Sequence, residues 1–127
     1  MRYLGVDFGL KKIGLSLGDD ETKIASPLEV IPREGAEKKI ASIVKDDGVD
    51  VLVVGLPLSA GEFHGEKQQK LTEAFIDELK KSGYDVRTCD ERYTSAESRR
   101  LQHEYGADAP EDALAAMLIL QSYFSEM

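Results

Sequence analysis

The sequence predicts an α/β fold in which a mixed five-stranded sheet carries helices on both faces. Two observations lead to this class. Apolar residues alternate with a period of two, typical of strands, through roughly the first quarter of the chain. After that, segments with the apolar spacing of helices alternate with short apolar segments typical of strands. The predicted order is βββαβαβαα, and right-handed crossovers between parallel strands place helices on both faces. A chain of 127 residues is expected to form one domain over residues 1–127.

Three strands are predicted to open the chain as an antiparallel meander. Residues 3–8 alternate apolar side chains with small or polar ones, and residues 13–18 do the same after a turn. The third strand is expected over 23–31. Pro27 favours an edge position or a bulge there, because proline cannot donate a hydrogen bond to a neighbouring strand.

The middle of the chain is predicted to alternate helices with buried strands. Apolar residues at helical spacing indicate a helix that starts near Ala36 and stops at Gly48. Residues 49–56 are almost continuously apolar, which is typical of a strand covered on both faces. A second helix is expected over 66–82 and a fifth strand over 84–89.

Two helices are expected to close the chain. Residues 94–97 have the form of a capping box, so one helix should start there. Pro110 is expected in the first turn of the last helix, where its missing donor costs little. The apolar run 113–120 indicates burial against the sheet, and it is far shorter than the roughly 20 residues that span a bilayer. We therefore expect no membrane partner.

Charge and cysteine content narrow the functional classes. Sixteen basic residues against 24 acidic ones give a net charge of −8, which argues against a protein that simply coats nucleic acid. The charge does not argue against a nucleic-acid enzyme, because bound divalent cations reverse the local sign. The single cysteine, Cys89, cannot form an internal disulfide, so we expect a reducing, cytoplasmic location.

Acidic residues stand at the ends of three predicted buried elements. Asp7 ends the first strand, Asp90 and Glu91 follow the fifth, and Asp112 lies in the first turn of the last helix. Each alone has a structural explanation: a turn before glycine, a polar loop, or a carboxylate at a helix dipole. Together they could form a cage for Mg²⁺ or Mn²⁺, which prefer oxygen ligands and can hydrolyse a phosphodiester. The residues alone leave open whether Asp90 or Glu91 is the ligand.

Four blocks of sequence, in order and spread over nearly the whole chain, resemble the YqgF/RuvX family. They are 5–9 (GVDFG) with 11–14 (KKIG), 54–59 (VGLPLS) followed by Gly61 and Gly65, 90–95 (DERYTS), and 112–120 (DALAAMLIL). The resemblance implies an RNase H-like fold and metal-dependent hydrolysis of phosphodiesters. It also implies that Asp7, Glu91 and Asp112 are both the catalytic residues and the metal ligands. Lys12 stands where the family often has arginine.

The names given to members of this family imply two kinds of substrate. The first is an rRNA precursor, with a role in 5′-end processing of pre-16S rRNA during ribosome biogenesis, and the alternative is a Holliday junction in DNA. A non-catalytic nucleic-acid-binding module of the same fold is a third alternative. Residues 104–111 are short and acidic where many members carry a basic loop. A homodimer stays open, because resolvases that cut two strands symmetrically usually act as dimers.

Overall fold

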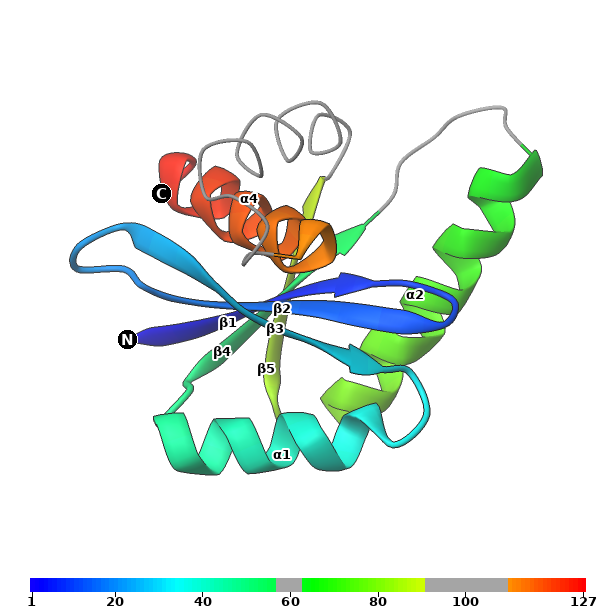
Figure 1. Cartoon of the computed structure of the whole chain (residues 1–127), viewed down its shortest axis with the longest axis horizontal. Coiled ribbons are helices and arrows are strands. Elements are labelled where there is room, and N and C mark those ends of the chain that lie inside the picture. Colours follow the sequence, from blue (N-terminus) through cyan, green and yellow to red (C-terminus); the bar gives the residue numbers. More distant parts are fainter. Residues whose placement is uncertain (57–62, 91–109) are drawn as a thin grey trace.

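The computed structural model describes residues 1–56, 63–90 and 110–127 (Figure 1). Its elements follow the predicted order. They are β1 (Arg2–Phe8), β2 (Lys12–Asp19), β3 (Ile24–Pro32), α1 (Ala36–Asp47), β4 (Val51–Leu56), α2 (Phe63–Lys81), β5 (Asp85–Asp90) and α4 (Glu111–Ser125). The helix predicted to start at residues 94–97 lies outside the described residues.

The five strands form one mixed sheet in the order β3-β2-β1-β4-β5. Strands β1, β2 and β3 pair antiparallel, whereas β4 is parallel to both β1 and β5. This arrangement confirms the predicted meander followed by crossovers. Strand β3 is an edge strand, and its register shifts so that Leu15 pairs with Glu29 while Ser16 pairs with Pro27. Pro27 therefore lies both at an edge and at a bulge, as its chemistry requires.

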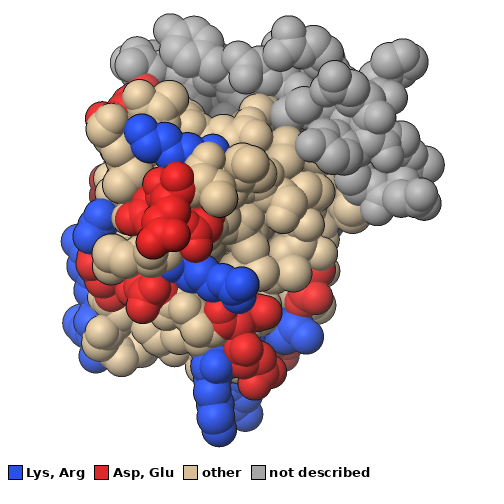
Figure 2. Space-filling model, turned by 90° about the vertical axis from the view of Figure 1, so that its left-hand side faces the viewer, with Lys and Arg blue, Asp and Glu red and all other residues tan. Residues whose placement is uncertain are grey.

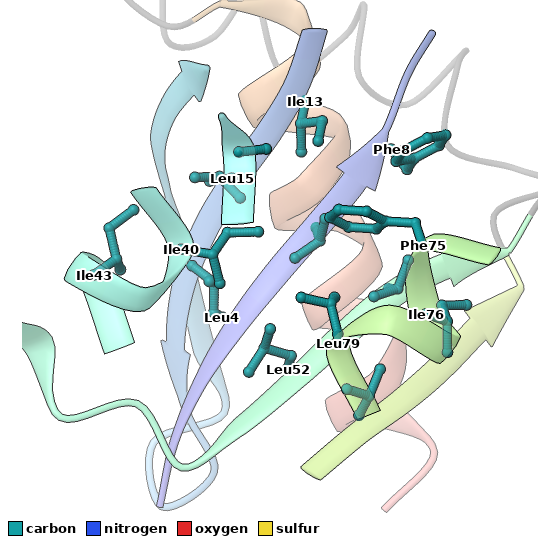
Figure 3. Close-up of a cluster of buried hydrophobic side chains, with 14 of the residues drawn as sticks. Leu4, Phe8, Ile13, Leu15, Ile40, Ile43, Leu52, Phe75, Ile76 and Leu79 are labelled. Atoms are coloured by element: carbon teal, nitrogen blue, oxygen red, sulfur yellow. The ribbon is translucent and has the colours of Figure 1, made fainter. Parts of the chain in front are cut away.

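Helices cover both faces of the sheet, as predicted. Helices α1 and α2 lie on one face and α4 on the other (Figure 1). The core is accordingly divided into two clusters of buried side chains. One cluster joins the sheet to α1 and α2, and Figure 3 shows Leu4, Phe8, Ile13, Leu15, Ile40, Ile43, Leu52, Phe75, Ile76 and Leu79 from it. The other joins the sheet to α4 through Tyr3, Ala25, Val51, Val53, Cys89, Leu114, Met117, Ile119, Leu120 and Phe124.

The ends of three helices show where sequence signals succeed and where they fail. Helix α1 ends at Gly48, whose φ of 65° is the left-handed conformation that glycine favours. Helix α2 begins at Phe63, three residues earlier than predicted. Pro110 is not in the first turn of α4: its extended ψ of 141° makes it the residue that precedes the helix. Within the described part of the chain, we find no helix with the length and hydrophobicity of a membrane span.

Candidate active site

Strand β1 presents Asp7 to the face of the sheet that α4 covers. Side chains alternate along a strand, and Leu4, Val6 and Phe8 all belong to the cluster under α1 and α2. Tyr3 belongs instead to the cluster under α4. Asp7 shares the face of Tyr3, and it is partly buried. Its carboxylate is thus carried on the α4 side of the sheet, at the end of β1.

Gly14 brings Asp112 to the same place. Gly14 is the direct cross-strand partner of Asp7 in the β1–β2 pair. A Cβ atom at Gly14 would overlap the backbone carbonyl of Asp112, so the first turn of α4 rests directly on this glycine. Asp7 and Asp112, 105 positions apart in the chain by their numbers, are therefore both neighbours of Gly14. The fold thus brings the backbones of these two residues, predicted from the sequence as candidate ligands, to the same glycine.

Small residues along the sheet allow α4 to lie this close. A Cβ at Gly5 would come within 2.7 Å of the Ala116 carbonyl oxygen, and one at Gly18 within 2.8 Å of the Phe124 ring. Between them, the buried Ser16 hydroxyl donates a 2.8 Å hydrogen bond to the Ala116 carbonyl. Sequence reasoning had used Gly14, Ser16 and Gly18 only as evidence for a strand. Their position on one face was the signal for a closely packed helix.

Lys12 forms an ion pair with Asp112 that sequence reasoning did not anticipate. The Lys12 Nζ atom lies 3.1 Å from Asp112 Oδ2. Lys12 opens β2 two residues before Gly14, so it shares the face of Gly14 and can reach the carboxylate. The Lys12 side chain is 66% exposed and that of Asp112 34% exposed. An ion pair this open to water contributes at most about 1 kcal/mol to stability.

Asp90 lies on the opposite face from Asp7 and Asp112. In β5, Cys89 belongs to the α4 cluster and the Arg87 guanidinium donates a 2.8 Å hydrogen bond to the Tyr123 hydroxyl on α4. Val86 belongs to the other cluster, and Asp90 alternates with Val86 along the strand. The described residues hold no group of three or more His, Cys, Asp or Glu arranged around a metal position, so Asp90 does not complete one. Glu91 lies outside the described residues.

The donors on the α4 face suit a hard divalent cation. Both Asp7 and Asp112 supply carboxylate oxygens, which Mg²⁺ and Mn²⁺ prefer over nitrogen or sulfur. Both side chains are partly buried, so they are held by the fold yet still reached by solvent. Such ions, when bound, activate water and stabilise a leaving oxygen in phosphodiester hydrolysis.

Comparison with known proteins identifies the family. The family model described as "RuvX: Holliday junction resolvase" matches residues 1–126. The chain belongs to the RuvX family. A relative from Anaeromyxobacter sp. (strain Fw109-5) is 38% identical over 132 residues, covering 97% of this chain and 96% of its own. One from Desulforudis audaxviator (strain MP104C) is 38% identical over 136 residues, covering 98% and 94%. Both carry the name "Putative pre-16S rRNA nuclease".

Solved structures show the same fold at low sequence identity. T. thermophilus RuvC in complex with a Holliday junction substrate matches with a TM-score of 0.65 and 15% identity, over 99% of this chain and 95% of that one. The Fowlpox virus resolvase in complex with Holliday junction DNA matches with a TM-score of 0.57 and 12% identity, over 99% and 98%. The RNase H-like fold expected for a RuvX member is confirmed. The nuclease names of the relatives and the resolvase family confirm the enzyme class, a phosphodiester hydrolase.

Proposed function

We propose that this RuvX-family enzyme is a divalent-metal-dependent nuclease that acts in the 5′-end processing of pre-16S rRNA. The observation that carries the proposal is the packing of Asp7 and Asp112 around Gly14 on one face of the sheet. A strand end and a helix start thereby each bring a carboxylate-bearing residue next to Gly14, and two carboxylates that converge there would repel each other without a cation between them. We propose further that residues 1–127 act as a single domain.

We assign the third carboxylate to Glu91. Strand alternation supports this choice over Asp90, because Cys89 faces α4 and Asp90 faces the other way. Asp7, Glu91 and Asp112 would then hold Mg²⁺ or Mn²⁺ from three separate segments of the chain.

In the reaction, the chain's own residues would hold the metal ions in position and leave them accessible to the substrate. The bound ions would supply the chemistry, by activating a water and stabilising the leaving oxygen. The start of α4 packs closely on Gly14, the cross-strand partner of Asp7, so the proposed ligand positions would be set before substrate arrives. Both side chains are partly exposed, so a phosphodiester could reach them from solvent.

An rRNA precursor is the substrate that the names of the more similar relatives favour. Relatives 38% identical to this chain carry the rRNA name, whereas the junction-bound structures are only 12–15% identical. The second candidate, cleavage of Holliday junctions, draws its support from the family description and from those two complexes.

A cleavage assay distinguishes the two substrates and tests the site. The protein is incubated with Mn²⁺ or Mg²⁺ and either an RNA carrying the 5′ leader of 16S rRNA or a four-way DNA junction. We expect cleavage of the RNA, and a loss of at least about 100-fold in Asp7→Asn and Asp112→Asn, since a metal ligand supports several kcal/mol of transition-state stabilisation. Asp77→Asn, at an exposed position on α2, removes the same charge and should cleave normally.

Each outcome of that assay has a definite meaning. Cleavage of the junction alone would establish the second candidate in place of the first. Binding without cleavage of either substrate, under every metal condition, would indicate the non-catalytic alternative. Full activity in Asp7→Asn would show that Asp7 is not part of the catalytic site.

A further inference from the structure

We propose that Lys12 is a built-in counter-ion that competes with the divalent metal for Asp112. The inference rests on the proposed function, because it takes Asp112 to be a metal ligand. Lys12 Nζ lies 3.1 Å from Asp112 Oδ2, so the ammonium contacts an oxygen that a metal ion would need. An ammonium and a divalent cation that contact the same carboxylate repel each other, so each weakens the binding of the other.

The fold fixes both partners of the pair independently of each other. The Asp112 backbone rests on Gly14, and a Cβ at that glycine would overlap its carbonyl. Lys12 is held by the β2 ladder, where it pairs with Pro32 of β3. The ion pair is therefore not needed to bring Asp112 to the site. Its contribution is electrostatic, and removing the ammonium should leave the carboxylate in place.

Exposure makes the pair weak enough to be displaced. Lys12 is 66% exposed, and its charge sits on a flexible four-carbon stem that can swing away without moving β2. In the absence of metal, the ammonium reduces the repulsion that Asp112 and Asp7 exert on each other. When a divalent ion arrives, that ion takes over the same neutralising task with twice the charge. Lys12 thereby stabilises the metal-free protein and weakens the apparent metal affinity.

Titration of the whole chain with Mn²⁺ alone, by calorimetry at low ionic strength, tests the competition. We expect Lys12→Met to bind Mn²⁺ about three- to fivefold more tightly than the wild type, the range that an exposed ion pair of this kind can account for. Lys12→Arg keeps the charge and should bind within a factor of about two of the wild type. Lys11→Met removes the same charge from the adjacent exposed residue and should have a smaller effect than Lys12→Met.

A second measurement separates competition from a general change in charge. Asp112→Asn should bind Mn²⁺ much more weakly, and adding Lys12→Met to that variant should not restore binding. Without metal, Lys12→Met should melt at a lower temperature than the wild type. The same substitution should have no such effect in the Asp112→Asn background, because the ion pair is already lost.

The results that would overturn the inference differ from those that would overturn the proposed site. If the wild type binds Mn²⁺ through Asp112 but Lys12→Met binds equally or more weakly, the competition is wrong while the site stands. If Asp112→Asn binds Mn²⁺ as the wild type does, the proposed site is wrong and the competition falls with it. Circular dichroism of each variant confirms that it is folded.

Discussion

At the scale of single residues, Asp7 and Asp112 carry like charges beside the same glycine, and this makes a testable prediction about stability. Without metal near pH 7, Asp7→Asn should melt at or above the wild-type temperature, because it removes one of two repelling charges with little change of shape. Mn²⁺ should stabilise the wild type by RT ln(1 + [L]/Kd) and the variant much less. Thermal melts with and without Mn²⁺ measure both effects.

Asp7→Ala is the necessary companion, because asparagine can still form the hydrogen bonds of a turn or cap. If both metal-free variants are markedly destabilised and both still cleave, Asp7 has only a structural role. A cap-like role would cost roughly 1 kcal/mol on removal.

Gly14 carries a second prediction at this scale. In Gly14→Ala the new methyl group meets the backbone of Asp112, which cannot turn aside as a side chain would. The start of α4 must shift, and we expect a loss of about 1–3 kcal/mol in unfolding free energy together with loss of Mn²⁺ binding. Gly18→Ala is the matched control, since its methyl group meets the Phe124 ring at the other end of α4. Denaturant melts and Mn²⁺ titration of both variants provide the measurement, and normal Mn²⁺ binding in Gly14→Ala would contradict the account.

At the scale of elements, a carboxyl group of α1, that of Glu37, is hydrogen-bonded to a carboxyl group of α2, that of Glu78. A side-chain hydrogen bond with Glu78 raises the pKa of Glu37 above its ordinary value of 4.5, because only a protonated carboxyl can donate to its neighbour. Arg33 and Lys38 line the same cavity between the helices. Since the folded pKa is raised, the contact adds stability below the unfolded pKa, and this contribution is lost as pH rises through the folded pKa.

Glu37→Gln should remove this pH dependence. The melting temperature of the variant relative to the wild type is expected to increase between pH 4 and pH 7, because only the wild type acquires a repelling pair of carboxylates. Glu73→Gln, an exposed position on α2 that accepts a hydrogen bond from Gln69, is the control. A wild-type and Glu37→Gln difference that is constant over this pH range would show that the two helices do not share the proton.

Elements whose signals are local were predictable, and those set by packing were less so. Pro27 predicted an edge position or a bulge because it has no N–H to donate, and Gly48 predicted the end of α1. The start of α2 was missed by three residues, because the first turn of a helix lacks the apolar spacing of its buried middle. Pro110 was misplaced by one position, since proline suits both the first turn and the residue before it.

At the scale of the whole molecule, the net charge makes a prediction about the affinity for nucleic acid. Acidic and basic side chains are intermixed on the side of the molecule that Figure 2 displays, and the whole chain carries a net charge of −8. We therefore expect weak binding of nucleic acid that falls steeply as salt is raised and improves with Mg²⁺. Fluorescence anisotropy with a labelled RNA at several salt concentrations measures this dependence. Tight binding at high salt without metal would contradict it.

The sequence pointed to the carboxylates of the proposed site, but not to the residues that surround them. Asp7 and Asp112 stood out because each lies at the end of a buried element. The sequence alone could not show which face of the sheet Asp90 lies on, because that face follows from how Cys89 and Arg87 of β5 pack against α4. The Lys12–Asp112 pair depends on how α4 crosses β2, and no local pattern in the sequence encodes that crossing.

The central claim is that Asp7 and Asp112 share a divalent metal site on the α4 face. An anomalous diffraction map of a crystal grown with Mn²⁺ tests it most directly. We predict a manganese peak at about 2.0–2.4 Å from carboxylate oxygens of both residues, with Glu91 completing the set and Lys12 turned away from Asp112. Carboxylates of Asp7 and Asp112 more than about 10 Å apart, or a peak bound elsewhere, would contradict the claim, because ligand distances near 2 Å cannot bridge that gap.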